Sequence, residues 1–422
     1  MLTLKQLRDN SAFIIERLNI KGFDAENIIN EVIKLDDNRK AIQTKLDTNL
    51  AEQNSIAKEI GMLFKQGKQT EAEAAKQRSV ELKELSKKMQ DEQAENEKRL
   101  SEKIVLLPNI PHTSVPVGKT ADDNVEVRRG GIIKELNDAL PHWELAKKYD
   151  IIDFELGVKL TGAGFPVYKG KGARLQRALI SMFLDINTAA GYLEIEPPIV
   201  VNEDSGFGTG QLPDKEGQMY HAQLDNFYLI PTAEVPVTNI YRDVILNKSD
   251  FPVKMTAYTP CFRREAGSYG KDVRGLNRLH QFDKVEIVEL SLPENSYQAL
   301  DRMVNHVEEI IKQLELPYRI IRLCGGDMSF TSALTYDFEV YSEAQKRWLE
   351  VSSVSNFESF QANRLKLRYR DENKKTQLAH TLNGSSLALP RIVAALLENN
   401  QTEHGILMPE LLQKYTGFEK ID

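Results

Sequence analysis

The stretch from Glu26 to Leu107 constrains the fold of this chain most, because it contains no proline over a length far beyond an ordinary helix. It is dense in Ala, Glu, Lys, Gln and Leu, residues with high helix propensity. Apolar residues recur every three or four positions through its first half, which is the spacing of a coiled-coil seam. This pattern predicts a long helix whose seam faces a partner. The expected seam, with its polar interruptions, consists of Ile28, Val32, Leu35, Arg39, Ile42, Leu46, Asn49, Gln53, Ile56, Ile60 and Leu63.

A break and a second, weaker seam complete this feature. Gln66-Gly67-Lys68 places a helix breaker in a polar turn. Two long helices with a short Gly-containing link predict an antiparallel hairpin over about 26–107. Each helix of roughly 35 residues would reach about 50 Å at ~1.5 Å per residue, and residues 1–25 are expected to form a small helical cap. The second seam is expected to consist of Leu82, Leu85, Met89, Asn96 and Leu100.

The polar seam positions bear on how the hairpin is used. A hairpin buried in a globule would not direct Arg39 or Gln53 at its partner, whereas an arm that projects into solvent tolerates them. Basic and acidic residues are about equal in the arm and are often spaced for i,i+4 pairs. A solvated coiled coil for dimerisation or spacing and an arm that grips RNA both fit this composition, because no basic block stands out.

Composition argues against several other classes of protein. The chain has 422 residues, a formal net charge of −7 and two cysteines, Cys261 and Cys324. Two thiols in so long a chain argue against a disulfide framework and against a cysteine-rich zinc site, and they favour a cytoplasmic location. No apolar run reaches the roughly 18 residues that span a bilayer, and the N-terminus lacks the apolar segment of a secretory signal, so no membrane partner is expected.

Prolines separate the arm from the rest of the chain. Pro108, Pro111 and Pro116 predict a rigid linker, which puts a helical arm at 1–110 and a second domain at 111–422. In the second domain, short β-rich runs and helical patterns form few regular βα units. This predicts an α+β domain with an antiparallel sheet flanked by helices. The expected strands are 194–201, 227–230, 255–262, 279–288, 335–340 and 348–353, and the expected helices are 174–190, 296–314 and 386–400.

The familiar nucleotide- and metal-binding motifs are missing from the sequence. Gly118-Lys119-Thr120 resembles the end of a P-loop, but Thr113 stands where the first glycine belongs. The glycines of 206–210 lack the spacing of a dinucleotide fingerprint, and the sequence has no HExxH and no two histidines at metal-ligand spacing. A nucleotide-dependent enzyme would need another way to bind phosphate.

Two expected strands within residues 259–286 carry a concentrated set of reactive side chains. Alternation puts Arg263 and Glu265 on one face of the first strand, and a polar loop at 266–275 leads to the second. A guanidinium can polarise an α-phosphate, a ring can sandwich adenine, and a carboxylate can bind an amino group. The same pattern also fits a surface hairpin with ordinary charges and one core phenylalanine. The side chains that share a face of the second strand are His280, Phe282, Lys284 and Glu286.

Five segments in order resemble the class II aminoacyl-tRNA synthetases, in their bacterial seryl form. FRREAGS (262–268) and HQFDKVE (280–286) resemble motif 2. Residues 173–200, which contain Pro198, are similar to motif 1, and residues 382–401 resemble motif 3 with its arginine at Arg391. The remaining similar segments, TAEVP at 232–236 and EVSSVSNFESFQANR at 350–364, match those that line the serine and ATP pockets. The arm and the linker also match the layout of the seryl-tRNA synthetases, so the resemblance covers nearly the whole chain.

The resemblance implies a role for each matching residue. Arg263 would bridge the substrate carboxylate and the α-phosphate, and Arg263, Glu350 and Arg391 would be catalytic. Mg²⁺ would be held by Glu350 and Ser353. Glu265 would read the amino group of adenine, with Phe282 and Arg391 covering the faces of its ring. The implied serine-binding residues are Thr232, Ala233, Glu234, Arg263, Glu286, Asn383 and Ser385, and the implied ATP-binding residues are Arg263, Arg264, Glu265, Phe282, Glu350, Val351, Ser352, Ser353 and Arg391.

Two details of these segments stay open at the level of sequence. Strict alternation groups Glu350 with Ser352, so Glu350 and Ser353 can reach one ion only if the strand bulges or ends between them. Motif 3 favours Ser385 as the serine contact, yet Ser386 follows where most members of the family carry glycine. The expected helix at 386–400 tolerates Pro390 only in its first turn.

The resemblance implies a homodimer, joined through the motif 1 region, that condenses L-serine with ATP and transfers the seryl group to tRNA(Ser). The arm would contact the long variable arm of the tRNA, and charging of tRNA(Sec) is left open. One alternative is a non-enzymatic RNA-binding or scaffold relative. The intact residues that argue against it are Arg263, Glu265, Phe282, Glu350 and Arg391. The other is an enzyme that charges another small amino acid or loads a carrier protein; the complete arm argues against carrier loading.

Overall fold

The computed structural model describes residues 1–214, 216–265 and 274–422. It divides into two compact units, one formed by 1–19 with 23–108 and the other by 20–22 with 109–422. Most of the loop expected at 266–275 lies outside the described residues. Within the described part of the chain, every helix is too short or too polar to cross a membrane.

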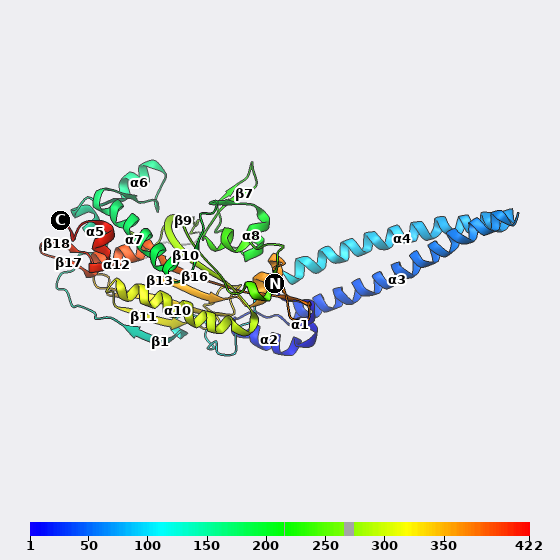
Figure 1. Ribbon diagram of the computed structural model, residues 1–422, viewed down its shortest axis with the longest axis horizontal. Helices are drawn as coiled ribbons and strands as arrows, with labels where there is room; N and C mark the ends of the chain where they lie inside the picture. Colours follow the sequence, from blue (N-terminus) through cyan, green and yellow to red (C-terminus); the bar gives the residue numbers. More distant parts are fainter. Residues whose placement is uncertain (215, 266–273) are drawn as a thin grey trace. The chain divides into compact units, whose positions relative to one another are not determined.

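The first unit contains the expected helical hairpin. Helices α1 (Leu4–Asp9) and α2 (Ser11–Ile20) precede α3 (Glu26–Lys65) and α4 (Gln69–Ile104), which run side by side (Figure 1). Polar seam residues bind across the pair: Asn49 Nδ2 donates to Leu82 O at 2.8 Å and to Ser86 Oγ at 2.7 Å. The hairpin prediction is confirmed, but Leu85 was wrongly placed in the seam. It is 42% exposed, and Ser86 is buried in its place.

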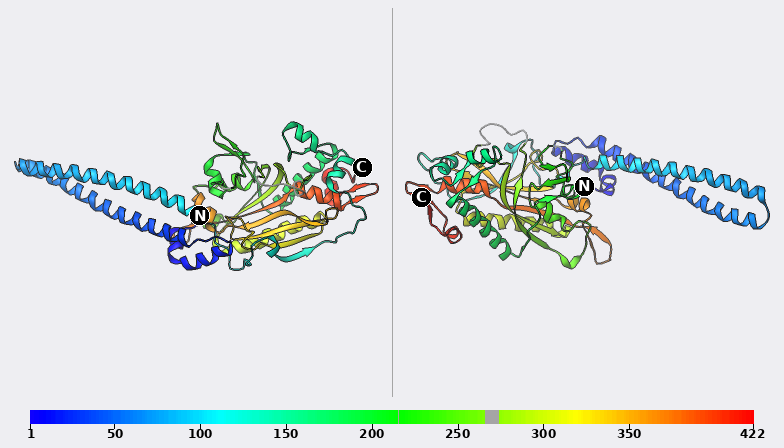
Figure 2. Two further views of the ribbon diagram at one scale, coloured as in Figure 1. Left: turned by 180° about the vertical axis from the view of Figure 1, so that it is seen from behind. Right: turned by 90° about the horizontal axis from the view of Figure 1, so that it is seen from above.

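The second unit is built on an antiparallel sheet, as the sequence predicts (Figure 2). Within the described residues its strand order is β1-β11-β12-β13-β16-β10-β9-β4, and only the short edge pair β4 and β9 is parallel. The strands are β1 (Val125–Gly130), β11 (Tyr318–Arg322), β12 (Leu334–Ser342), β13 (Arg347–Asn356), β16 (His380–Ala388), β10 (Gln281–Ser291), β9 (Val253–Phe262) and β4 (Leu193–Glu194).

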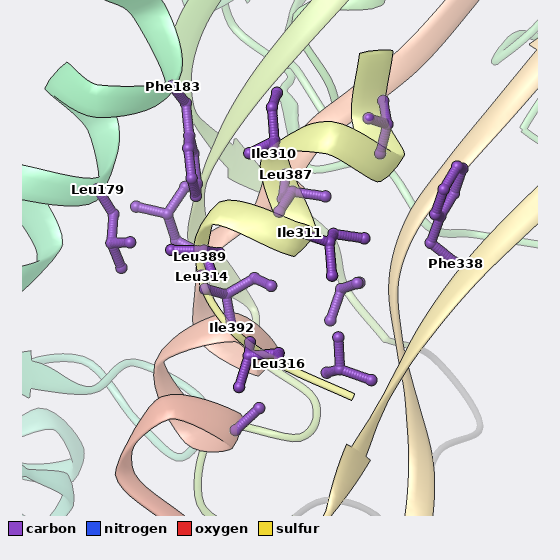
Figure 3. Close-up of a cluster of buried hydrophobic side chains, with 14 of the residues drawn as sticks. Leu179, Phe183, Ile310, Ile311, Leu314, Leu316, Phe338, Leu387, Leu389 and Ile392 are labelled. Atoms are coloured by element: carbon purple, nitrogen blue, oxygen red, sulfur yellow. The ribbon is translucent and has the colours of Figure 1, made fainter. Parts of the chain in front are cut away.

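Three helices pack on this sheet and enclose its core: α7 (Gly170–Ala189), α10 (Ser296–Gln313) and α12 (Leu389–Asn399). Figure 3 shows Phe183 from α7, Ile311 from α10 and Ile392 from α12 meeting in one apolar cluster. Each of these side chains is at most 1% exposed, and burial of this kind stabilises the fold by roughly 1.5–3 kcal/mol per large side chain.

Two expected elements were wrong in extent. The helix expected at 386–400 starts at Leu389, because residues 386–388 end β16; Pro390 lies in its first turn, where proline is tolerated. The strand expected at 194–201 divides into β4 and β5 (Val200–Val201), because Pro197 and Pro198 cannot donate to a ladder.

Smaller elements surround the sheet. The helices are α5 (His142–Lys148), α6 (Phe154–Leu160), α8 (Glu203–Thr209), α9 (Glu234–Asn239), α11 (Ser359–Leu365) and α13 (Glu410–Thr416). The short strands are β2 (Ile152–Asp153), β3 (Val167–Tyr168), β6 (His221–Ala222), β7 (Phe227–Leu229), β8 (Ile245–Asn247), β14 (Arg368–Arg370), β15 (Thr376–Leu378), β17 (Gln401–Thr402), β18 (Gly405–Leu407) and β19 (Lys420–Ile421).

Candidate active site

The candidate site residues lie on or beside four neighbouring strands in the middle of the sheet, β13, β16, β10 and β9. β9 and β10 pair in antiparallel fashion, with Phe282 opposite Cys261. β16 lies on the other side of β10 and sets Ser385 opposite Glu286. The sheet thus brings together segments that are far apart in the sequence.

The Glu286 carboxylate is the centre of a buried polar cluster and is 1% exposed. Its Oε1 accepts a hydrogen bond from Asn383 Nδ2 at 3.1 Å. Its Oε2 accepts from Thr232 Oγ1 at 3.2 Å and, more weakly, from Ser385 Oγ at 3.5 Å. Three of the residues predicted to bind serine therefore converge on the carboxylate of a fourth, Glu286.

Lys284 also belongs to this cluster, although the sequence analysis did not assign it to the site. Its Nζ lies 2.6 Å from Glu286 Oε2 and 2.7 Å from Thr232 Oγ1. Both members of the ion pair are buried, so removing one partner would leave an uncompensated charge. The available signal was its position two residues before Glu286, on the same face of the strand.

The two serines of β16 have different surroundings. Ser385 approaches Glu286, whereas the fully buried Ser386 donates to Asn187 Oδ1 at 2.9 Å. Asn187 in turn donates to Thr256 Oγ1 at 2.9 Å, within the contact between α7 and the sheet. The geometry therefore favours Ser385 as the residue that faces the polar cluster and gives Ser386 a packing role.

Glu234 begins α9 and is also buried. Burial, followed by the charge of Glu286, raises the pKa of the Glu234 carboxyl to about 7. Its Oε1 accepts from Gln361 Nε2 at 2.6 Å. Ala233, which precedes it, is fully buried in an apolar cluster, so its side chain adds no polar group to the site.

The prediction that Arg263 and Glu265 share one face of a strand was wrong, because β9 ends at Phe262 and both residues follow it. The Arg263 guanidinium lies over the ring of Phe282, 5.3 Å from its centroid. Arg263 and Arg264 are both exposed. Glu265 has a positive φ of 49° and forms an ion pair with Arg278 at 3.2 Å. A cation and an aromatic ring thus lie together, and the Glu265 carboxylate two residues after Arg263 is held by a left-handed backbone conformation and by the ion pair with Arg278.

β13 contains the bulge that the spacing of Glu350 and Ser353 requires. The register with β12 shifts so that Val351 has no partner, while Glu350 and Ser352 each have one. Val351 and Ser352 are consequently both buried, whereas Glu350 is exposed and Ser353 half-buried. The bulge allows the side chains of Glu350 and Ser353 to face the same surface. Because the side chains of Val351 and Ser352 are buried, these two residues could contribute to an ATP site only through their backbone groups.

Asp337, which the sequence analysis missed, lies opposite Ser353. Its Oδ1 is buried without a hydrogen-bond partner among the described residues. Burial, and then the charge of Glu350, raise the pKa of the Asp337 carboxyl well above its ordinary range. An orphaned carboxylate oxygen next to a second carboxylate and a hydroxyl suits a hard cation such as Mg²⁺, which prefers oxygen ligands.

Arg391 reaches this surface from the first turns of α12. Its Nη1 donates to Glu350 O at 2.7 Å and lies 3.5 Å from Glu350 Oε2. Its Nε donates to Asn277 O at 3.1 Å. The structure therefore places Arg391 beside the predicted metal ligand, with its guanidinium held at two points.

Comparisons with known proteins agree with this arrangement. The model of the seryl-tRNA synthetase N-terminal domain matches residues 1–111, and that of the tRNA synthetase class II core domain (G, H, P, S and T) matches residues 219–400. The serine–tRNA ligase of Salinibacter ruber is 51% identical over 100% of this chain and 99% of its own length. That of Carboxydothermus hydrogenoformans is 45% identical over 100% and 99%.

Solved structures show the same similarity. The seryl-tRNA synthetase from Pyrococcus horikoshii complexed with ATP superposes with a TM-score of 0.93 at 33% identity, covering 100% of this chain and 99% of its own. The cytoplasmic serine–tRNA ligase from Naegleria fowleri in complex with AMP has a TM-score of 0.89 at 25% identity, with the same coverage.

Proposed function

Because the chain belongs to the seryl-tRNA synthetase family, we propose that this ATP-dependent ligase condenses L-serine with ATP to seryl-adenylate and then transfers the seryl group to tRNA(Ser). The observation that carries this proposal is the convergence of Thr232, Asn383 and Ser385 on the buried Glu286 carboxylate. That cluster has the hydrogen-bonding chemistry to bind a small hydroxyl-bearing amino acid.

Serine recognition is assigned to the two carboxylates of the cluster. Glu234 and Thr232 bind the ammonium group, while Glu286 and Ser385 bind the hydroxyl. Alanine would leave these buried polar groups unpaired. A site of this kind typically has a kcat/KM about 10⁴-fold lower for the analogue that lacks the hydroxyl. The extra methyl group of threonine has to be excluded sterically.

In the first reaction, a serine carboxylate oxygen attacks the α-phosphorus of ATP and pyrophosphate leaves. Arg263 lies beside the ring of Phe282 and bridges the carboxylate and the α-phosphate, so it stabilises the charge that develops in the transition state. Glu265 accepts from the adenine amino group, and Arg391 covers the ring face opposite Phe282. Arg264 and the β13 segment 350–353 complete the ATP site.

Glu350 and Ser353 are the proposed Mg²⁺ ligands, and the ion would neutralise charge on the phosphates of ATP. The orphaned oxygen of Asp337 beside them supports this assignment. In the second reaction, a hydroxyl of the terminal ribose of the tRNA attacks the adenylate carbonyl and AMP leaves. Positioning and charge stabilisation account for both steps without a covalent intermediate on the protein.

The domain roles are part of the same proposal. Residues 1–110 form the tRNA-binding arm and residues 111–422 the catalytic domain, with two copies joined through the motif 1 region at 173–200. A cytoplasmic location is supported by the free, buried state of both cysteines, Cys261 and Cys324. The proposal extends to charging of tRNA(Sec) through the same arm.

Exchange of pyrophosphate into ATP, measured with serine, threonine, alanine and glycine in turn, tests the substrate assignment. The exchange rate with serine is expected to exceed the rates with the other three amino acids by orders of magnitude. Comparable rates with any of them would refute the assignment of the pocket.

A deletion within the helical hairpin tests the role of the arm. Removing residues 50–81 and closing the gap with a short Gly-Ser turn shortens α3 and α4 together and retains the bond from Asn96 Nδ2 to Leu35 O. Pyrophosphate exchange should be unchanged, whereas charging of tRNA(Ser) should be lost. A shortened protein that charges tRNA normally would exclude the arm from tRNA binding.

A further inference from the structure

His142, the first residue of α5, is fully buried, and hydrogen bonds hold both of its ring nitrogens. Its Nε2 lies 2.8 Å from the backbone nitrogen of Leu276, and its Nδ1 lies 2.7 Å from Glu398 Oε1. Because a backbone N–H can only donate, Nε2 must accept, and the ring proton is therefore on Nδ1, where it is donated to Glu398.

Glu398, near the end of α12, is also fully buried. Besides the ring of His142, its Oε1 accepts from the backbone nitrogen of His142 at 2.9 Å and from Gln345 Nε2 at 3.1 Å. Its Oε2 accepts from the hydroxyl of Ser342. A buried carboxylate held by several donors forms a rigid anchor, since losing any one of them leaves buried polar atoms unpaired.

The anchor holds the backbone that follows the motif 2 loop. Asn277 comes directly after Leu276, and its side-chain nitrogen donates to Gln345 Oε1 at 3.0 Å. Both ends of this dipeptide are thus tied to residues that bind Glu398. The carbonyl oxygen of Asn277 in turn accepts the Nε hydrogen bond of Arg391.

Residues 274–277 pack closely against His142. Gly275 has a φ of +65°, and a Cβ added there would lie 2.2 Å from His142 Nε2, so only glycine fits. Next to it, the Arg274 guanidinium lies 4.8 Å from the ring centroid of Trp143, the second residue of α5. Residues 274–277 are therefore clamped against the start of α5 rather than merely passing it.

We propose that the His142–Glu398 pair is a positioning unit for the ATP site. It fixes Leu276 and Asn277, and the carbonyl oxygen of Asn277 holds the Arg391 guanidinium at the angle needed to cover adenine. His142 does not touch substrate and acts through Asn277 and Arg391. The inference rests on the proposed ATP-binding role of Arg391.

Substitution of the histidine separates this role from a purely structural one. His142→Phe keeps a ring but removes both hydrogen bonds, and the KM for ATP in pyrophosphate exchange should rise about tenfold or more. The KM for serine should change much less, because no hydrogen bond or ion pair among the described residues joins the Glu286 cluster directly to this network. His142→Gln, whose amide can both accept from Leu276 and donate to Glu398, should recover most of the ATP affinity. His404→Gln, at an exposed histidine, is the matched control.

A double-mutant cycle with Arg391→Ala tests whether the effect passes through Arg391. Direct titration with ATP should show that His142→Phe weakens binding in the wild-type background but adds little once Arg391 is gone. Additive losses, or equal changes in the KM values for ATP and serine, would overturn the proposal. If His142→Phe does not fold, Glu398→Gln, which preserves shape, must show the same ATP-specific loss for the proposal to stand. Failure of the proposed function would appear differently, as an unsubstituted protein without serine-dependent exchange.

Discussion

Serine binding should weaken as the pH falls from 8 to 6, because the proposed partner of the substrate ammonium is a buried acid. Burial and the nearby charge of Glu286 raise the pKa of Glu234 from its ordinary 4.5 to about 7, against the opposing effects of Gln361, Lys284 and Arg263. Near pH 7, about half of the protein therefore carries a protonated Glu234. Only the ionised form offers the negative charge that a serine ammonium needs.

The size of the effect follows from the fraction of ionised Glu234. If only the carboxylate form binds, the apparent Kd is the intrinsic Kd divided by that fraction. With a pKa of about 7, the apparent Kd is multiplied by about 1.1 at pH 8, about 2 at pH 7 and about 11 at pH 6. Free serine keeps its ammonium charge over this range, so the roughly tenfold loss of serine affinity arises from protonation of the protein.

Calorimetric titration with serine at pH 6, 7 and 8 measures this dependence, and buffers of different ionisation enthalpy reveal the released proton. Glu234→Gln should bind serine weakly with a flat pH profile, whereas Glu403→Gln, at an exposed position, should keep the wild-type slope. An unsubstituted protein whose serine affinity is independent of pH would refute the reasoning.

The raised pKa of Glu234 also affects the stability of the fold, because the folded state binds the proton more tightly than the unfolded state does. The contribution of Glu234 to the free energy of unfolding is therefore greatest below pH 4.5. This contribution, roughly 3 kcal/mol, is lost as the pH rises through about 7.

Four further substitutions test the site and its surroundings. Arg263→Ala should lower kcat/KM for pyrophosphate exchange by about 10²–10³-fold, the usual cost of one donor to a developing oxyanion, and near-normal exchange would remove Arg263 from the site. Lys284→Met should raise the KM for serine more than that for ATP, because it removes the cation that pairs with Glu286 at 2.6 Å. Equal changes in the two KM values would contradict a role of Lys284 in serine binding. Ser385→Ala should reduce the preference for serine over alanine, whereas Ser386→Ala should spare that preference and lower the unfolding free energy by about 1–3 kcal/mol, as amino acid competition and chemical denaturation would show.

The helical arm was predictable because its determinants are local. Helix propensity and the recurrence of apolar residues depend on neighbours three and four positions away, so the hairpin of α3 and α4 follows from the sequence. The prediction of the weaker seam in the second helix was less accurate. Leu85 is the more apolar residue, but Ser86 occupies the seam because Asn49 on the other helix donates to its hydroxyl. The choice between adjacent residues depended on a partner that lies 37 positions away.

In the second unit, the sequence by itself determined which residues carry chemistry and, through strand alternation, that Phe282, Lys284 and Glu286 could share a face. Only the tertiary structure decided how those faces meet. The bulge at Val351, the ion pair of Lys284 and the clamp of His142 on Leu276 all depend on strand register and on helix packing. Register is set by pairing between segments far apart in the chain, so no local pattern contains it.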